Sequence, residues 1–144
     1  MGFYADVYGR SFAVFCTGLY KEKYLSLFSR WAKGTVDGEA AALVLAEFNE
    51  QVAVFDTVYL ECIEGNGGIE REYAREYDEL FKMLELDIYP TVECIGKMSV
   101  MQAVAFLTVI FDIECISEGC VNHFASDGSI YALLMRVRVL MQNG

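Results

Sequence analysis

Proline and histidine are almost absent from this 144-residue sequence, which contains one of each. Disordered chains are usually rich in proline and poor in hydrophobic residues, whereas 55% of this chain is hydrophobic. We therefore expect a folded domain with a well-filled core, and the length fits a single helical domain over residues 1–144. The single histidine, His123, excludes any site that needs two imidazole groups.

An apolar run long enough to cross a bilayer is also missing. The longest run, residues 98–111, is interrupted by Ser99, Gln102 and Thr108, and a membrane span needs about 20 residues. The first residues lack the basic stretch and the apolar run of a secretory signal. The five cysteines are an odd number in apolar surroundings, which is typical of reduced thiols. These observations predict a cytoplasmic protein without membrane contact.

The pattern of apolar residues is helical through most of the chain. Ser99 is followed by Gln102 at the spacing of a capping box, which predicts a buried central helix over residues 98–116. Around it we expect an all-α fold, a compact bundle of five or six helices. The other expected helices span residues 19–33, 39–65, 69–89 before Pro90, and 129–142.

The N-terminal segment, residues 3–16, permits two interpretations. Residues 3–8 alternate large and small or acidic side chains, and residues 12–16 form a short apolar run that also suits a buried strand. Periodicity does not decide between helix and strand in such short runs. We favour helix here, with a short β-hairpin as the alternative.

The negative charge is concentrated in the middle of the chain. The whole chain carries a net −10, but residues 37–118 alone carry −14, from 18 acidic and four basic residues. Within residues 61–87 there are nine acidic and three basic residues. Like charges so close together oppose compaction, so this segment is more acidic than solubility alone requires.

The segment 62–81, CIEGNGGIEREYAREYDELF, contains the triplet REY twice, four residues apart. On a helix this spacing places Tyr73 and Tyr77 on one line and most acids opposite the apolar stripe. One interpretation is a solvated face with ion pairs such as Arg75–Glu79 and Asp78–Lys82. The excess of acids favours a second interpretation, a surface that binds a basic partner. The predicted partner-binding residues are Glu64, Glu70, Glu72, Glu76, Asp78, Glu79 and Glu85.

The glycine-rich turn at residues 65–68 does not predict a phosphate site. A P-loop follows a strand and continues into Lys-Ser or Lys-Thr, and neither feature is present. The neighbouring acids Glu64, Glu70 and Glu72 would also repel an anion. A turn between two helices is the better interpretation.

The cysteines and His123 do not predict a metal or catalytic site. Cys94, Cys115, Cys120 and His123 do not have the spacing of a zinc site. A cysteine nucleophile needs a lowered pKa, whereas acidic neighbours raise it. We therefore expect no enzyme activity, no metal and no cofactor.

The class of function that fits best is a small acidic inhibitor or immunity protein that neutralises a basic protein partner. A nuclease toxin is the expected partner, because an enzyme that binds polyanions has a cationic substrate cleft. The same acidity disfavours direct binding of nucleic acid. One alternative is a nucleic-acid mimic that inhibits a restriction or defence protein. Another is a helical adaptor or regulatory subunit that forms a homodimer, for which the candidate surface is the aromatic stripe Tyr20, Tyr24, Leu27, Phe28 and Trp31.

Overall fold

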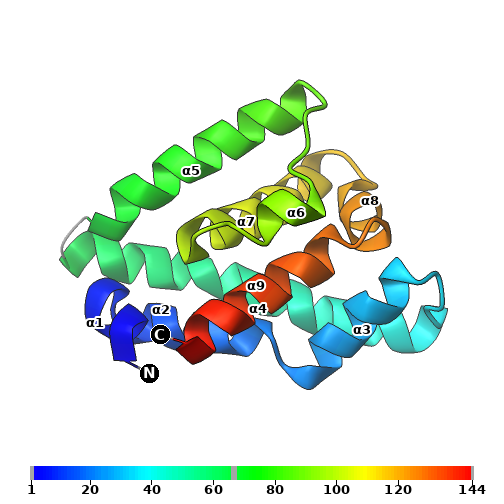
Figure 1. Cartoon of the computed structure of the whole chain (residues 1–144), viewed down its shortest axis with the longest axis horizontal. Helices are drawn as coiled ribbons and strands as arrows, with labels where there is room; N and C mark the ends of the chain where they lie inside the picture. Colours follow the sequence, from blue (N-terminus) through cyan, green and yellow to red (C-terminus); the bar gives the residue numbers. More distant parts are fainter. Residues whose placement is uncertain (1, 66–67, 144) are drawn as a thin grey trace.

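The computed structural model describes residues 2–65 and 68–143, with the backbone alone for residues 2, 61–65 and 68–70. These residues form helices and no strand, so the predicted all-α bundle is confirmed (Figure 1). Six of the helices have ten or more residues, and three are shorter. In chain order they are α1 (Gly2–Tyr8), α2 (Arg10–Leu19), α3 (Glu22–Ala32), α4 (Gly38–Gly65), α5 (Gly68–Glu85), α6 (Val92–Ile95), α7 (Val100–Ile116), α8 (Cys120–Ser126) and α9 (Ser129–Asn143).

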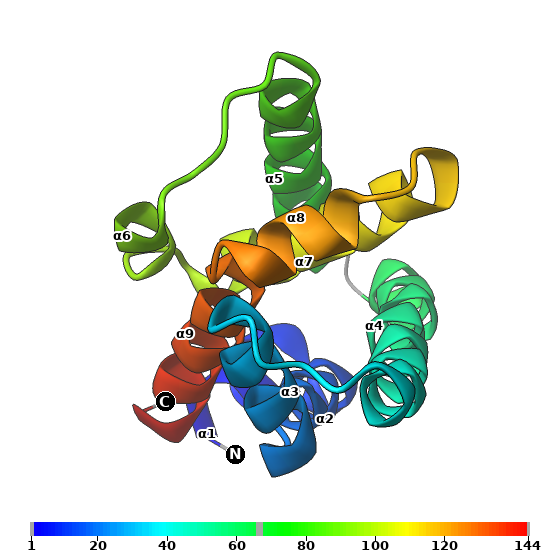
Figure 2. The same cartoon turned by 90° about the vertical axis from the view of Figure 1, so that its right-hand side faces the viewer.

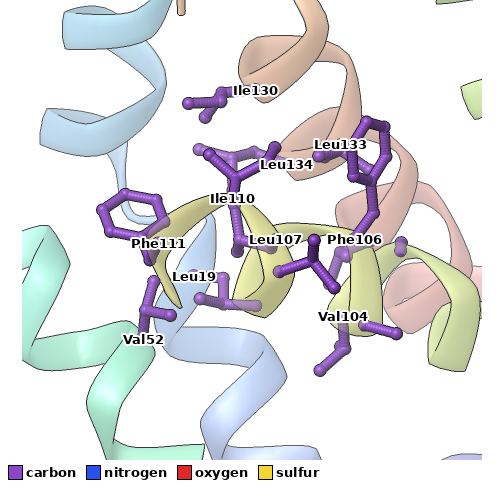
Figure 3. Close-up of a cluster of buried hydrophobic side chains, with 14 of the residues drawn as sticks. Leu19, Val52, Val104, Phe106, Leu107, Ile110, Phe111, Ile130, Leu133 and Leu134 are labelled. Carbon is purple, nitrogen blue, oxygen red and sulfur yellow. The ribbon is translucent and has the colours of Figure 1, made fainter. Parts of the chain in front are cut away.

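Helix α7 lies at the centre, as predicted for residues 98–116. Ser99 caps it: its Oγ accepts a hydrogen bond from the Gln102 amide at 3.1 Å, and its own amide donates to Gln102 Oε1 at 2.9 Å. Apart from Gln102, every residue from Val100 to Phe111 is buried. Figure 3 shows side chains of α7 packed between those of α2, α4 and α9. A helix that is apolar on all sides is stable only when other helices surround it.

The N-terminal segment is helical, so the β-hairpin alternative is wrong. Gly9 separates α1 from α2, and its φ of 97° is a conformation that residues other than glycine rarely adopt. The buried residues of α2 recur every three or four positions, while Val14 and Thr17 between them are exposed. The apolar run at residues 12–16 is therefore one face of an amphipathic helix packed on α4 and α9.

The aromatic stripe of α3 belongs to the core. Tyr24, Leu27 and Phe28 are buried, and Tyr20 and Trp31 are half-buried against them. The ring centroid of Phe28 lies 4.9 Å from that of Phe48 on α4. Most of this stripe is consequently covered within one chain.

Helix α5 stands apart from the bundle and packs mainly on α7 and α4 (Figure 2). It ends at Glu85, earlier than Pro90 requires, because Asp87 adopts the left-handed conformation with φ 57°. The amide of Ile88 then donates to the carbonyl of Met83 at 2.9 Å, and that of Asp87 to Leu84 at 3.1 Å. This is the Schellman arrangement, in which the chain satisfies the last carbonyls of a helix as it turns away.

Helix α7 ends where the predicted range of residues 98–116 ends. The helix ends at Ile116, and Gly119, with φ 110°, begins the next helix, α8. The carboxylate of Glu114 accepts from the amides of Gly119 and Val121, at 3.2 and 2.8 Å. Glu114 therefore supplies the cap that no side chain at the start of α8 provides.

None of the helices over residues 2–65 and 68–143 is both long and apolar enough to cross a bilayer. The four cysteines whose side chains are described, Cys16, Cys94, Cys115 and Cys120, are free thiols.

Candidate functional site

Five of the seven predicted partner-binding residues lie on the described part of α5, in two environments. The side chains of the other two, Glu64 and Glu70, lie outside the described residues. Glu72 and Glu76 lie at the edge of α5 that packs against the protein. The exposed acids are Asp78, Glu79 and Glu85.

Glu72 and Glu76 are engaged inside the protein. The phenol of Tyr8 on α1 donates to the carboxylate of Glu72, with oxygen distances of 3.1 and 3.0 Å. Glu76 is only 9% exposed, and its carboxylate lies 3.5 Å from the guanidinium of Arg75. Glu72 therefore connects α5 to α1, and the burial of Glu76 leaves little of its carboxylate for a partner.

Asp78, Glu79 and Glu85 are exposed at the surface. The ion pairs Arg75–Glu79 and Asp78–Lys82 are not present among the described residues, because Arg75 pairs with its neighbour Glu76 instead. The interpretation of α5 as a solvated face is thus wrong about these two ion pairs. Three acids remain on α5 without a compensating cation within ion-pair distance.

A hollow beside Asp78 brings in two acids that the sequence did not single out. It has a volume of about 290 Å³ and lies between α4, α5 and α7. Asp56 on α4, Asp78 on α5 and Asp112 on α7 are all exposed and line it, and none of the described residues that line it is basic. Its remaining lining is apolar or aromatic: Phe55, Tyr59, Tyr73, Ala74 and Tyr77. We call this site the aspartate hollow.

Tyrosine rings form the wall of the aspartate hollow. The ring centroid of Tyr73 lies 5.3 Å from that of Tyr59 and 5.7 Å from that of Tyr77. The phenol of Tyr77 donates to Asp112 at 2.6 Å. Thr108 Oγ1 donates its proton to the Ala105 carbonyl, so at 2.7 Å it accepts from the Tyr73 phenol. These two hydrogen bonds connect α5 to α7.

The phenols near the acids have raised pKa values. Burial raises the pKa of Tyr73 to about 12, against a smaller opposing effect of the Thr108 hydrogen bond and with the help of Asp112 and Asp56. Burial and the Glu72 hydrogen bond raise the pKa of Tyr8 to about 12. The pKa of Tyr77 rises as well, first by burial and then through Asp112. These phenols stay neutral donors through the physiological range.

The raised phenol pKa values predict a loss of stability at alkaline pH. In the unfolded chain a tyrosine titrates near pH 10, so the unfolded state releases its protons first as the pH rises. The stabilisation from Tyr8 and Tyr73 is therefore complete below about pH 10 and is lost between about pH 10 and pH 12. Urea unfolding at about pH 9 and about pH 11 is expected to give a lower free energy of unfolding at the higher pH.

Tyr73→Phe provides the control for this pH dependence, because phenylalanine keeps the ring and removes the titrating group. Its free energy of unfolding is expected to fall less between the two pH values than that of the native chain. An equal fall in both proteins contradicts the assignment to Tyr73.

The cysteine and histidine cluster gives no metal site in the described residues, where no group of three His, Cys, Asp or Glu side chains is arranged to hold an ion. Burial first and Glu114 second raise the pKa of Cys120 to about 11, as expected for a thiol beside an acid. Exposed Cys94 has a lowered pKa through its hydrogen bond with Thr91, but no base lies beside it among its described interactions. The glycine-rich turn joins α4 to α5, and Asn66 and Gly67 within it lie outside the described residues.

No protein-family model, curated protein or solved structure matches this chain. Function is therefore inferred from the site alone.

The acids on α5 were accessible to sequence reasoning because they share one helix. Asp56 and Asp112 were not, because only the packing of α4 and α7 against α5 brings them to Asp78. The one local signal is that each interrupts an apolar stretch, Asp56 within VAVFDTVYL and Asp112 directly after residues 98–111.

Proposed function

We propose that this protein is a small acidic inhibitor that binds a basic protein partner in the cytoplasm. A nuclease toxin is the partner class that fits best, since its cleft must be cationic to bind a polyanion. The inhibitor covers that cleft with its acidic surface and excludes the substrate. Binding of this kind requires no chemistry by the inhibitor itself, and we propose no enzyme activity.

The observation that carries this proposal is the convergence of Asp56, Asp78 and Asp112 from three helices on one hollow, with no basic residue among the described residues that line it. Glu79 and Glu85 extend the same negative charge along α5. Acids gathered on an outlying helix steer a basic partner toward it and reject acidic ones. The helix is held rigidly by Tyr73 and Tyr77, so little ordering is needed on binding.

Capture from the host lysate tests the proposal. The tagged protein is immobilised at low salt, eluted with a salt gradient, and the bound proteins are identified by mass spectrometry. We expect one basic nuclease that elutes as the ionic strength rises and is inactive while bound, because salt screens charge pairs at an interface. Absence of a basic protein from the eluate contradicts the proposal.

The two alternatives give different results in the same experiment. A nucleic-acid mimic retains a restriction or defence protein and competes with DNA for it, although the large buried core fits a compact binder better than an elongated mimic. An adaptor that self-associates retains only its own copies. The feature that favours the adaptor is a set of exposed apolar side chains at the α5–α6 connection, namely Leu86, Ile88, Tyr89 and Val92. Sedimentation velocity tests whether the protein self-associates.

A further inference from the structure

We propose that the aspartate hollow binds the guanidinium group of one arginine side chain, the anchor by which the basic partner docks. This inference depends on the proposed function for the source of the arginine, but the hollow itself can be tested without the partner. It identifies one recognition site within a broad acidic surface.

The charge of the hollow calls for a cation. Asp56, Asp78 and Asp112 line it, and no Lys, Arg or His is among the described residues that do so. Asp112 accepts one hydrogen bond, from Tyr77, and a carboxylate has about four lone-pair sites in total. Each of the three acids therefore retains acceptor capacity for an incoming donor.

Two of the three phenols that line the hollow already use their protons within the protein. Tyr77 donates to Asp112, and Tyr73 donates to Thr108. The oxygens of these two phenols are left to accept only. A ligand that fills this space must bring several donors of its own, and a guanidinium group carries five N–H donors and no acceptor.

The aromatic wall distinguishes arginine from lysine. The rings of Tyr59, Tyr73 and Tyr77 lie side by side, with centroid distances of 5.3 and 5.7 Å between neighbours. A planar guanidinium stacks on such rings, forms paired hydrogen bonds with a carboxylate, and is less strongly hydrated than an ammonium group. These properties favour arginine at a site that is both aromatic and acidic.

The size of the hollow fits a side chain. Its volume of about 290 Å³ lies just below the range of about 300–1,000 Å³ that is typical of small-molecule sites. A divalent metal is a poor occupant, because the acids are not grouped closely enough within the described residues. One arginine side chain, entering from the solvent side, matches both the volume and the charge.

Nuclear magnetic resonance with two small probes tests the inference. Isotope-labelled protein is titrated with N-acetyl-arginine amide and, separately, with N-acetyl-lysine amide at low salt. We expect the arginine probe to shift the amide signals of residues around Tyr73, Tyr77 and Asp112, and to bind more tightly than the lysine probe. Loss of one charged hydrogen-bond partner, in Asp56→Asn or Asp78→Asn, is expected to weaken arginine binding by roughly tenfold.

A matched variant controls for the loss of charge. Glu39→Gln removes one negative charge from the same helix as Asp56, about 25 Å away by the rise of the helix, and is expected to leave arginine binding unchanged. Asp56 and Asp78 are exposed, so their replacement by asparagine leaves the fold intact. Asp112 is avoided because it also holds Tyr77.

Three results would overturn the inference: equal affinity for both probes, signal shifts spread over all acidic residues, or unchanged binding in Asp56→Asn and Asp78→Asn. The proposed function fails separately. If arginine binds in the hollow but the host lysate yields no basic protein, the guanidinium site stands and the inhibitor does not. If a basic nuclease is captured but the arginine probe does not bind in the hollow, only the proposed arginine site is wrong.

Discussion

Replacing Phe48 with alanine is expected to lower the free energy of unfolding by about 3–5 kcal/mol. Phe48 is fully buried on α4, and its ring centroid lies 5.0 Å from that of Tyr24, 4.9 Å from Phe28 and 5.6 Å from Phe111. These contacts join α3, α4 and α7. Removing the ring leaves a cavity that three helices cannot all close, so the lost contacts and the cavity both destabilise the fold.

Urea unfolding followed by far-ultraviolet circular dichroism measures this change. Phe3→Ala is the matched control, because Phe3 is 58% exposed and the same substitution there is expected to change stability by less than about 0.5 kcal/mol. If Phe48→Ala does not fold, Phe48→Leu retains part of the volume and is expected to be less stable than the native chain but more stable than the alanine variant. A loss below about 1 kcal/mol in Phe48→Ala is inconsistent with a close-packed core at this position.

Reversing Asp78, Glu79 and Glu85 to lysine is expected to slow association with the captured basic nuclease by about 10- to 1,000-fold at low salt. The three side chains are exposed and form no ion pair among the described residues, so the helical circular dichroism is expected to stay unchanged. Their replacement turns an attractive field into a repulsive one at the point of contact. Stopped-flow association rates at two ionic strengths measure the effect, which shrinks in high salt because the charges are screened.

A second triple reversal separates local charge from total charge. Asp6, Glu22 and Glu39 are also exposed but lie on α1, α3 and the start of α4, and reversing them changes the net charge by the same amount. We expect this variant to associate much faster than the α5 variant. Equal rates in the two variants contradict a docking surface on α5 and leave only a general effect of charge.

The sequence predicted the helices well because their signals are local. The capping box of Ser99 and Gln102 and the apolar run after it were enough to place the central helix. The run at residues 12–16 was ambiguous because a five-residue apolar run fits a strand or a helix equally, and the helix follows from burial against α4 and α9. The end of α5 was predicted too late in the sequence. The helix stops because Asp87 adopts a left-handed backbone conformation, which the local sequence did not indicate.

The candidate site was predicted only in part because it is assembled from separate helices. Asp78 was recognised on α5, whereas Asp56 and Asp112 become its neighbours only through packing. Glu72 and Glu76 were predicted on a charged surface, but they lie at its inner edge. The contact of Glu72 with Tyr8 depends on where α1 packs, and the sequence pattern of α5 does not indicate the position of α1.

The order of helices around α7 has a consequence for biosynthesis. Its neighbours α8 and α9 are made after it, although α9 provides much of its cover. At roughly 5–20 residues per second, translation from Ile116 to Asn143 takes about 1 to 5 s, during which the most apolar helix has no complete packing site. A nascent chain stalled in this interval exposes α7 to aggregation and chaperone capture. Packing of α7 is therefore expected to be completed only when α9 leaves the ribosome.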